Sequence, residues 1–189
     1  MAVHPKVFVI SGVGGAGKGT IVDRLHAARP DLWWSVSWAT RPQRADEVDG
    51  IHYHFCSREE FEQEVARGGF LEWFEPYGHL KGTPKEPIVE ALRSGSDCLV
   101  ELDIDGALAV SEAFGDQAQV VFLVAPSAEV QAERLRGRGD DAADVETRIA
   151  RAETEIDKAA SAGFKILVNE DFERTFAQVV AILGDRTVT

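Results

Sequence analysis

A glycine-rich segment at residues 12–20, GVGGAGKGT, has the residue types and spacing needed to bind phosphate. Gly12, four further residues, Gly17 and Lys18 match the frame of a phosphate-binding loop, between an apolar run at 7–10 and a helical pattern at 18–28. Glycines let backbone N–H groups converge on phosphate oxygens, the helix N-terminus adds a positive dipole end, and Lys18 supplies a mobile cation. The alternative, a glycine turn without a ligand, is disfavoured because strand, lysine and helix are all in register.

The predicted phosphate-binding residues of this segment are Gly12, Gly14, Gly15, Ala16, Gly17, Lys18, Gly19 and Thr20. Gly19 follows the lysine, at a position where the frame normally carries the Ser or Thr that binds magnesium. Thr20 comes directly afterwards, so the hydroxyl is displaced by one position and not absent. We therefore expect Thr20 to be the magnesium ligand of the loop.

The elements that must hold this loop follow from alternating apolar runs and helical patterns. Buried strands are predicted at 7–10, 99–103, 120–124 and 166–168, further extended segments at 33–38, 51–55, 70–74 and 79–82, and helices at 18–28, 57–67, 83–95, 106–114, 128–136, 144–160 and 172–183. Two capping boxes, Ser57 with Glu60 and Thr83 with Glu86, mark helix starts, the second with Pro84 at the first helical position. Continuous apolar strands separated by helices predict an α/β fold, a parallel sheet covered by helices on both faces.

Composition excludes several classes of protein. The 189 residues suit one domain, and 20 Lys and Arg against 32 Asp and Glu give a net charge of −12, which disfavours nucleic-acid and membrane-surface binding. Two cysteines make no disulfide scaffold, and neither a signal peptide nor a membrane-spanning run is evident, so a cytoplasmic location is expected. His52, His54 and Cys56 do not predict a zinc site, because residues i and i+4 of a strand lie about 13 Å apart.

Several further blocks resemble, in order and spacing, the guanylate kinase family. They are SVSWATR at 35–41 with Arg44, Glu47, Gly50 and Tyr53, then FLEW at 70–73, Gly82-Thr83, ELD at 101–103 with Gly106-Ala107, RLRGRG at 134–139, and Val168-Asn169. The resemblance runs from about residue 6 to 183. It implies a P-loop kinase fold with a core (1–32, 84–133 and 155–189), an NMP-binding insert at about 33–83 and a lid at about 134–154. It also implies transfer of a phosphoryl group from ATP to GMP, and to dGMP, with Mg²⁺, in a monomer or homodimer.

The resemblance implies that GMP is bound by Ser37, Arg41, Arg44, Tyr53, Glu72, Lys81, Thr83 and Asp103. The residue types suit this role, since each arginine can direct two N–H groups onto a phosphate. Glu72 lies among apolar neighbours, and its carboxylate can accept the adjacent N1–H and N2–H₂ donors of guanine, whereas adenine presents an acceptor at N1. Ser37 can donate to guanine O6. Asp103 has two interpretations, a further guanine-side acid or a carboxylate that acts on magnesium through water.

On the donor side, the resemblance implies that Asn169 contributes to ATP binding and that Arg134, Arg138 and Arg148 act with Lys18 in catalysis. Arg134 and Arg138 are four residues apart, on one helix face. Arginines over the transferred group stabilise the charge on its equatorial oxygens. The acceptor is already a phosphate anion, so no general base is required.

The chain departs from the family pattern at five places, one of which is Lys165, where the family commonly has an Asp. Lys81 replaces a second phosphate-binding tyrosine, Ala45-Asp46 replaces Pro-Gly, Asp105 replaces Gln, and the stretch between Arg138 and Arg148 is one residue shorter. Two alternatives follow, a kinase of this fold that acts on another phosphorylated acceptor, and a binding module without catalysis.

Overall fold

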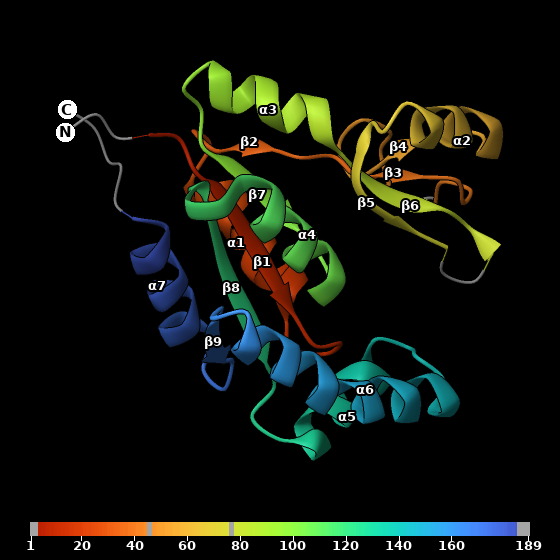
Figure 1. The fold of residues 1–189 in the computed structure, drawn as a ribbon. Coiled ribbons are helices and arrows are strands. Elements are labelled where there is room, and N and C mark those ends of the chain that lie inside the picture. The colour runs from red at the N-terminus through yellow and green to blue at the C-terminus, as the bar shows by residue number, and fades with distance from the viewer. Residues whose placement is uncertain (1–3, 45–46, 76–77, 185–189) are drawn as a thin grey trace.

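A five-stranded parallel sheet forms the centre of the protein (Figure 1). The computed structural model describes residues 4–44, 47–75 and 78–184, so Ala45 and Asp46 lie outside the described residues. The strands are β1 (Val7–Gly12), β2 (Trp33–Trp34), β7 (Cys98–Glu101), β8 (Ala118–Val124) and β9 (Lys165–Val168), in the order β2-β7-β1-β8-β9. All neighbouring pairs are parallel. The α/β prediction is confirmed.

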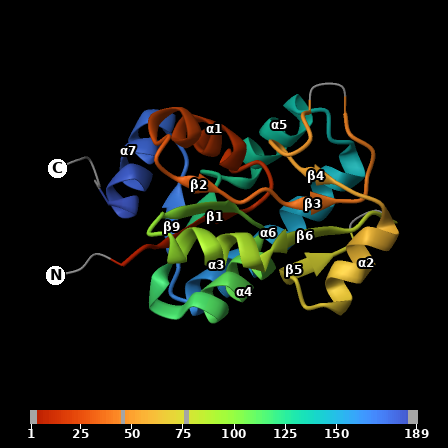
Figure 2. The same ribbon diagram turned by 90° about the horizontal axis from the view of Figure 1, so that it is seen from above.

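Helices cover both faces of this sheet (Figure 2). On one side lie α1 (Lys18–Ala28) and α7 (Phe172–Leu183), and on the other α3 (Lys85–Arg93) and α4 (Ile104–Phe114), followed by a 3₁₀ turn at Gly115–Gln117. Because side chains alternate along a strand, Phe8 and Ile10 pack in the cluster with α1 and α7, whereas Val7 and Val9 pack in the cluster with α3 and α4. The core therefore has one layer on each side of β1.

A second, mixed sheet has the strand order β4-β3-β6-β5. Its strands are β3 (Trp38–Ala39), β4 (His54–Phe55), β5 (Phe70–Phe74) and β6 (Lys81–Pro84), and helix α2 (Arg58–Ala66) lies between β4 and β5 in the chain. The first predicted capping box is confirmed, since the Ser57 side chain accepts the Glu60 N–H while the Glu60 carboxylate accepts the Ser57 N–H. The predicted extended segments at 70–74 and 79–82 correspond to β5 and, displaced by two residues, β6.

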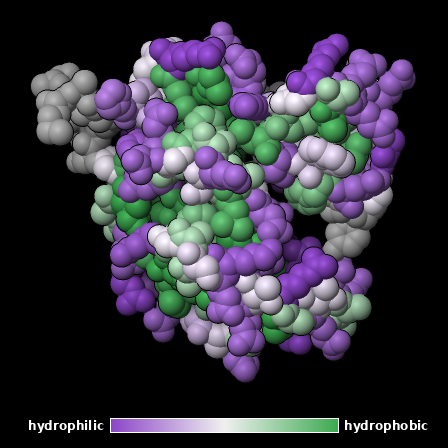
Figure 3. Space-filling model, in the orientation of Figure 1, coloured by the Kyte–Doolittle hydropathy of each residue, from purple (hydrophilic) through white to green (hydrophobic). Residues whose placement is uncertain are grey.

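Helices α5 (Ala128–Gly137) and α6 (Ala142–Ser161) lie beyond the carboxyl ends of β1 and β8 (Figure 1). Ala132, Leu135 and Val145 join them in a small apolar cluster separate from the two clusters of the main sheet. A hollow separates these helices from the part of the molecule that contains α2 (Figure 3). No helix in the described part of the chain is long and apolar enough to span a membrane.

Three local predictions were wrong. Thr83 and Glu86 do not form a capping box, because Thr83 and Pro84 belong to β6, α3 begins at Lys85, and the Thr83 hydroxyl donates to Glu72 instead. The extended segment at 33–38 divides into β2 and β3, which belong to different sheets. Only His54 and Phe55 of the segment at 51–55 form a strand, since residues 50–52 make a turn whose Gly50 has φ +77°.

Candidate active site

The glycine-rich segment forms a loop between β1 and α1, as the sequence predicts. Lys18 Nζ donates to the carbonyl oxygens of Gly12 (2.5 Å) and Val13 (3.2 Å), which holds the ammonium group over the loop. Burial lowers the pKa of Lys18, against the opposing effect of nearby Glu101. A phosphate in the loop would supply the negative charge that this buried cation lacks.

Two side chains from distant segments support the loop. Asn169 Nδ2 donates to the Ala16 carbonyl at 2.7 Å, and Gln131 Nε2 donates to the Gly14 carbonyl at 2.9 Å. Gly17 has φ +88°, and a Cβ there would lie 2.6 Å from Asn169 Nδ2, so only glycine fits. The sequence predicts that Gly12 binds phosphate, but the structure shows a packing reason for a glycine there. A Cβ added at Gly12 would lie 2.2 Å from the carbonyl oxygen of Leu123 in β8.

A cavity of about 560 Å³ lies on the outer side of the loop. It is bordered by Val13, Gly15, Gly17, Lys18, Gly19, Thr20, Glu101, Arg134, Arg138, Asn169, Glu170 and Phe172, and we call it the donor cavity. Arg134 Nη2 donates to the Asn169 carbonyl at 3.0 Å, while its buried Nη1 has no hydrogen-bond partner in the described residues. The structure thus brings two of the three predicted lid arginines to this cavity.

The third lid arginine, Arg148, lies against the loop without bordering the donor cavity. A Cβ at Gly14 would be 3.4 Å from Arg148 Nη1. Arg138 follows α5 as its C-cap residue, so Arg134 lies inside the helix and Arg138 just beyond its end.

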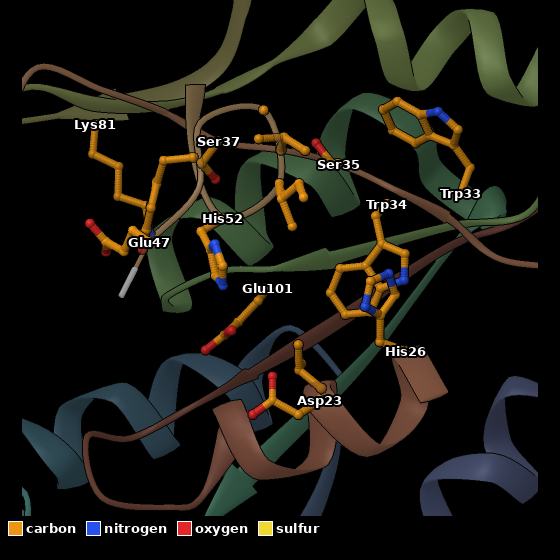
Figure 4. Close-up of a pocket in the computed structure, with 15 residues that line it drawn as sticks. Asp23, His26, Trp33, Trp34, Ser35, Ser37, Glu47, His52, Lys81 and Glu101 are labelled. Carbon is orange, nitrogen blue, oxygen red and sulfur yellow. The ribbon is translucent and has the colours of Figure 1, made fainter. Parts of the chain in front are cut away.

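A larger cavity of about 770 Å³ opens between α1, β2 and the segment that carries the second sheet (Figure 4). We call it the acceptor cavity. Ser37, Tyr53 and Lys81, three of the predicted GMP ligands, border it. Lys81 and Glu47 approach it from one side, and Asp23 and Glu101 from the other (Figure 4). Trp33 and Trp34 also border this cavity. The Trp34 ring packs edge-on against the His26 ring, with centroids 4.5 Å apart.

The two predicted phosphate-binding arginines of the acceptor side are placed differently from the other ligands. The Arg41 guanidinium is held by both carboxylate oxygens of Glu47, with Nη1 2.6 Å from Oε2, and lies 4.9 Å from the centre of the Tyr53 ring. Hydrogen bonding to Arg41 lowers the pKa of Glu47 to about 2. The Arg44 backbone N–H donates to Glu47 at 2.8 Å, and its side chain is exposed. Neither arginine borders the acceptor cavity.

A small cavity of about 160 Å³ shares Lys18 and Glu101 with the donor cavity and Lys81 and Glu101 with the acceptor cavity, and we call it the linking cavity. It is bordered by Lys18, Glu72, Phe74, Lys81, Glu101, Leu102 and Asp103. Glu72 Oε1 accepts the Thr83 hydroxyl at 2.6 Å, and burial raises the pKa of Glu72 above its usual value, partly offset by this hydrogen bond. Lys81 Nζ lies 5.3 Å from the centre of the Tyr53 ring, which therefore contacts both Lys81 and Arg41.

Thr20 and Asp103 offer the oxygen ligands that Mg²⁺ prefers, at the donor cavity and the linking cavity. Thr20 is exposed in the first turn of α1 and borders the donor cavity. Asp103 caps α4 by accepting the Gly106 N–H through Oδ1 at 2.8 Å, which leaves Oδ2 for a water-mediated contact. One hydroxyl and one carboxylate suit Mg²⁺, which usually keeps several of its waters. Within the described residues, no three His, Cys, Asp or Glu side chains form a metal-binding group.

Two functional candidates were missed by the sequence reasoning. Glu101, at the end of β7, borders the donor, acceptor and linking cavities. Glu47 fixes Arg41. Both residues occur in the blocks that carry the resemblance, but only Asp103 of the 101–103 block was given a role. The position of Glu101 at the carboxyl end of a buried strand was the signal that could have found it.

Known guanylate kinases are similar to this protein over nearly the whole chain. A family model described as guanylate kinase matches residues 4–186. A guanylate kinase of Synechococcus sp. (strain CC9311) is 41% identical over 172 residues, which cover 90% of each chain. One of Carboxydothermus hydrogenoformans is 40% identical over 176 residues, covering 93% of this chain and 85% of the relative. The crystal structure of guanylate kinase from Anaplasma phagocytophilum superimposes with a TM-score of 0.73 at 27% identity, covering 97% of this chain and 86% of that one.

Proposed function

We propose a specific division of labour for the active-site residues, starting from the premise that the chain belongs to the guanylate kinase family, which phosphorylates GMP to GDP using ATP. The observation that carries the proposal is the linking cavity. Lys18 of the phosphate loop and Glu72 of the acceptor side border the same small space. The loop lysine and the acceptor-side carboxylate are therefore close enough to border one transfer site.

ATP occupies the donor cavity in this proposal. Its phosphates lie on the backbone N–H groups of the loop, with Lys18 as the mobile cation. Arg134 and Arg138 border this space, and Arg148 lies against the loop at Gly14. These cations stabilise the negative charge that spreads over the equatorial oxygens during transfer. Asn169 supports ATP binding indirectly, by fixing the Ala16 carbonyl.

GMP occupies the acceptor and linking cavities. Glu72, steadied by Thr83, accepts the N1–H and N2–H₂ donors of guanine, and Ser37 donates to O6. Tyr53 and Lys81 border the phosphate end. Arg41 and Arg44 complete the phosphate site when the segment that carries them moves toward the ligand, a closure of the kind that positions substrates in many enzymes. Asp103 borders the linking cavity together with Glu72, where it can act as a further guanine-side acid.

Mg²⁺ would be held by Thr20 and, through water, by Asp103. When bound, this ion neutralises phosphate charge and orients the oxygens of the donor. The chain's own contribution is positional, since Thr20 borders the donor cavity and Asp103 the linking cavity.

We also propose the division into a core, an acceptor-binding insert and a lid at about 134–154. The pairing of β2 with β7 supports starting the insert after Trp34 and not at residue 33. The partners are the nucleotides ATP and GMP, not nucleic acid, because the net charge is −12. We propose that the chain works in the cytoplasm as a monomer or homodimer.

Initial rates with ATP and Mg²⁺ across GMP, dGMP, IMP, AMP, CMP and UMP test the assignment of the acceptor site. GMP and dGMP should be phosphorylated fastest. IMP keeps N1–H but lacks the 2-amino donor, so its kcat/KM should be about 10-fold lower or worse. Turnover of AMP above GMP would refute the role of Glu72, and equal rates for IMP and GMP would refute its contact with the 2-amino group.

A further inference from the structure

Two lid arginines share one carboxylate oxygen. Arg138 Nη2 lies 2.7 Å from Asp140 Oδ2, and Arg148 Nε lies 3.4 Å from the same atom. The Asp140 side chain is only 16% exposed, against 56% for Arg138. Asp140 belongs to the connection between α5 and α6, the stretch that is one residue shorter than in the family pattern. The structure thus contains an Arg–Asp–Arg triad beside the phosphate loop.

The backbone fixes Asp140 in this place. Helix α5 ends in a Schellman motif, in which the Gly139 N–H donates to the Arg136 carbonyl (2.9 Å) and the Asp140 N–H donates to the Leu135 carbonyl (3.2 Å). Gly139 supplies the required positive φ of +91°. Leu135 is fully buried in the apolar cluster between α5 and α6. The carboxylate is therefore attached to a rigid turn and not to a flexible loop.

The charges explain why a carboxylate is needed there. Two guanidinium groups that contact one oxygen repel each other, and in the absence of phosphate nothing else in the triad offsets this repulsion. Arg148 Nε is buried and makes no hydrogen bond in the described residues, so Asp140 is the anion that balances it. Hydrogen bonding to Arg138 lowers the pKa of Asp140, which keeps the carboxylate ionised.

The triad leaves most of the arginine donors available. A guanidinium carries five N–H groups, and the ion pair with Asp140 engages Arg138 through Nη2. Arg138 still borders the donor cavity, and Arg148 Nη1 still lies near Gly14. Asp140 therefore gathers the two cations while Arg138 still borders the donor cavity and Arg148 still lies against the phosphate loop.

We propose that Asp140 is a positioning residue for phosphoryl transfer, which holds Arg138 and Arg148 together over the donor phosphates before ATP arrives. Asp140 touches neither nucleotide. It reduces the reorganisation that the lid would otherwise need in the transition state. This inference rests on the role proposed above for the lid arginines.

The test compares Asp140→Asn with Asp141→Asn, a matched control one residue along. Asp141 caps α6 by accepting the Asp144 N–H at 2.9 Å, and asparagine caps equally well. Asp140→Asn should lower kcat by about 10- to 100-fold, the cost of misplacing catalytic groups. KM for GMP and the dissociation constant for ATP should change by less than about threefold, and Asp141→Asn should keep kcat within about twofold. Asp140→Glu, which keeps the charge, should recover part of the loss.

A second arm separates positioning from stability. In an Arg138→Met/Arg148→Met background, Asp140→Asn should change kcat by less than about twofold, because its targets are gone. Unchanged kcat in Asp140→Asn, an equal loss in Asp141→Asn, or a full additional loss in the double-Met background would each overturn the inference. If the two Met substitutions alone leave kcat at the wild-type value, the proposed lid role fails. If they lower kcat and Asp140→Asn does not, only the inference about Asp140 fails.

Discussion

Replacing Glu72 by Gln changes the hydrogen-bonding character of the acceptor site while keeping its shape. Glu72 packs tightly, since a Cβ at Gly106 would lie 3.2 Å from Glu72 Cγ, and glutamine fills the same space. The Thr83 hydroxyl can still donate to the remaining oxygen. One carboxylate oxygen becomes an NH₂ donor, however, and it would face one of the two guanine donors. The substitution thus removes one hydrogen bond from guanine to a charged group. It also places the glutamine NH₂ opposite a guanine N–H, so that two donors face each other.

The expected size of the effect follows from this exchange. A hydrogen bond to a charged group contributes about 1.5–3 kcal/mol. At about 1.4 kcal/mol per factor of ten, kcat/KM for GMP should fall by about 10- to 150-fold. Because Glu72 borders the linking cavity and not the donor cavity, the dissociation constant for ATP should stay within about twofold.

The pH dependence has a definite sign. Burial raises the pKa of Glu72 above 4.5, and protonation removes its capacity to accept both donors. In the wild type, KM for GMP should therefore rise as the pH falls through this raised pKa, whereas Glu72→Gln should lack that rise. The raised pKa also means that the buried charge disfavours the folded state above it, so the thermal midpoint of Glu72→Gln at pH 7 should not be below that of the wild type.

Steady-state rates of diphosphate formation, with GMP and ATP varied in turn, measure these effects. Glu62→Gln is the control, because Glu62 is an exposed acid of α2 that makes an ion pair with Arg58 at 3.1 Å and borders none of the three cavities. That variant should match the wild type within about twofold. The reasoning is refuted if Glu72→Gln weakens ATP binding as much as GMP use, or if kcat/KM for GMP stays within threefold of the wild type.

Three further predictions concern other parts of the site. Lys81→Met should raise the KM for GMP by about 10-fold and make that KM less dependent on ionic strength. Lys81→Tyr should restore much of the affinity for GMP but not the salt dependence. Steady-state rates between 20 and 300 mM KCl check both expectations. Arg41 lowers the pKa of Glu47 to about 2, so the ionised carboxylate stabilises the fold above pH 4.5. The free energy of unfolding should therefore fall by about 1 kcal/mol as the pH falls from 4.5 to 2. Glu47→Gln should lose less stability over this range, which acid titration followed by circular dichroism measures. Gly17→Ala should weaken ATP binding at least 10-fold by calorimetry, because its Cβ would meet Asn169 at 2.6 Å in a backbone conformation that costs about 1–2 kcal/mol, and wild-type affinity would contradict this.

Much of the fold was predictable because local signals agreed with the final packing. The run at 7–10 is apolar throughout since β1 is covered on both faces, and the helix at 18–28 begins directly after Gly17, which is its N-cap residue. The predicted capping box of Thr83 and Glu86 was wrong for a physical reason. Thr83 has two possible hydrogen-bond partners, the start of a helix and the Glu72 carboxylate, and the second lies 11 residues away in sequence. A local pattern cannot reveal a partner brought close by strand pairing.

The candidate site shows the same limit. Lys18 and its loop were readable because all the parts are adjacent in sequence. The contact between Arg41 and Glu47 and the sharing of Asp140 by two arginines depend on where loops turn, which composition and spacing do not specify. Glu101 was overlooked because its importance comes from three cavities meeting at the end of β7.

The pairing of β2 with β7 has a consequence for the order in which the protein folds. Trp33 pairs with Cys98 and Trp34 with Leu99, so the chain leaves the main sheet and returns one strand away after residues 35–97. Closing so long an unstructured loop would cost on the order of 4 kcal/mol of chain entropy. If the antiparallel pair of β5 and β6 forms first, the intervening chain is already compact and much of that cost is met by its own contacts. Early folding of the segment that carries the second sheet would then speed completion of the main sheet.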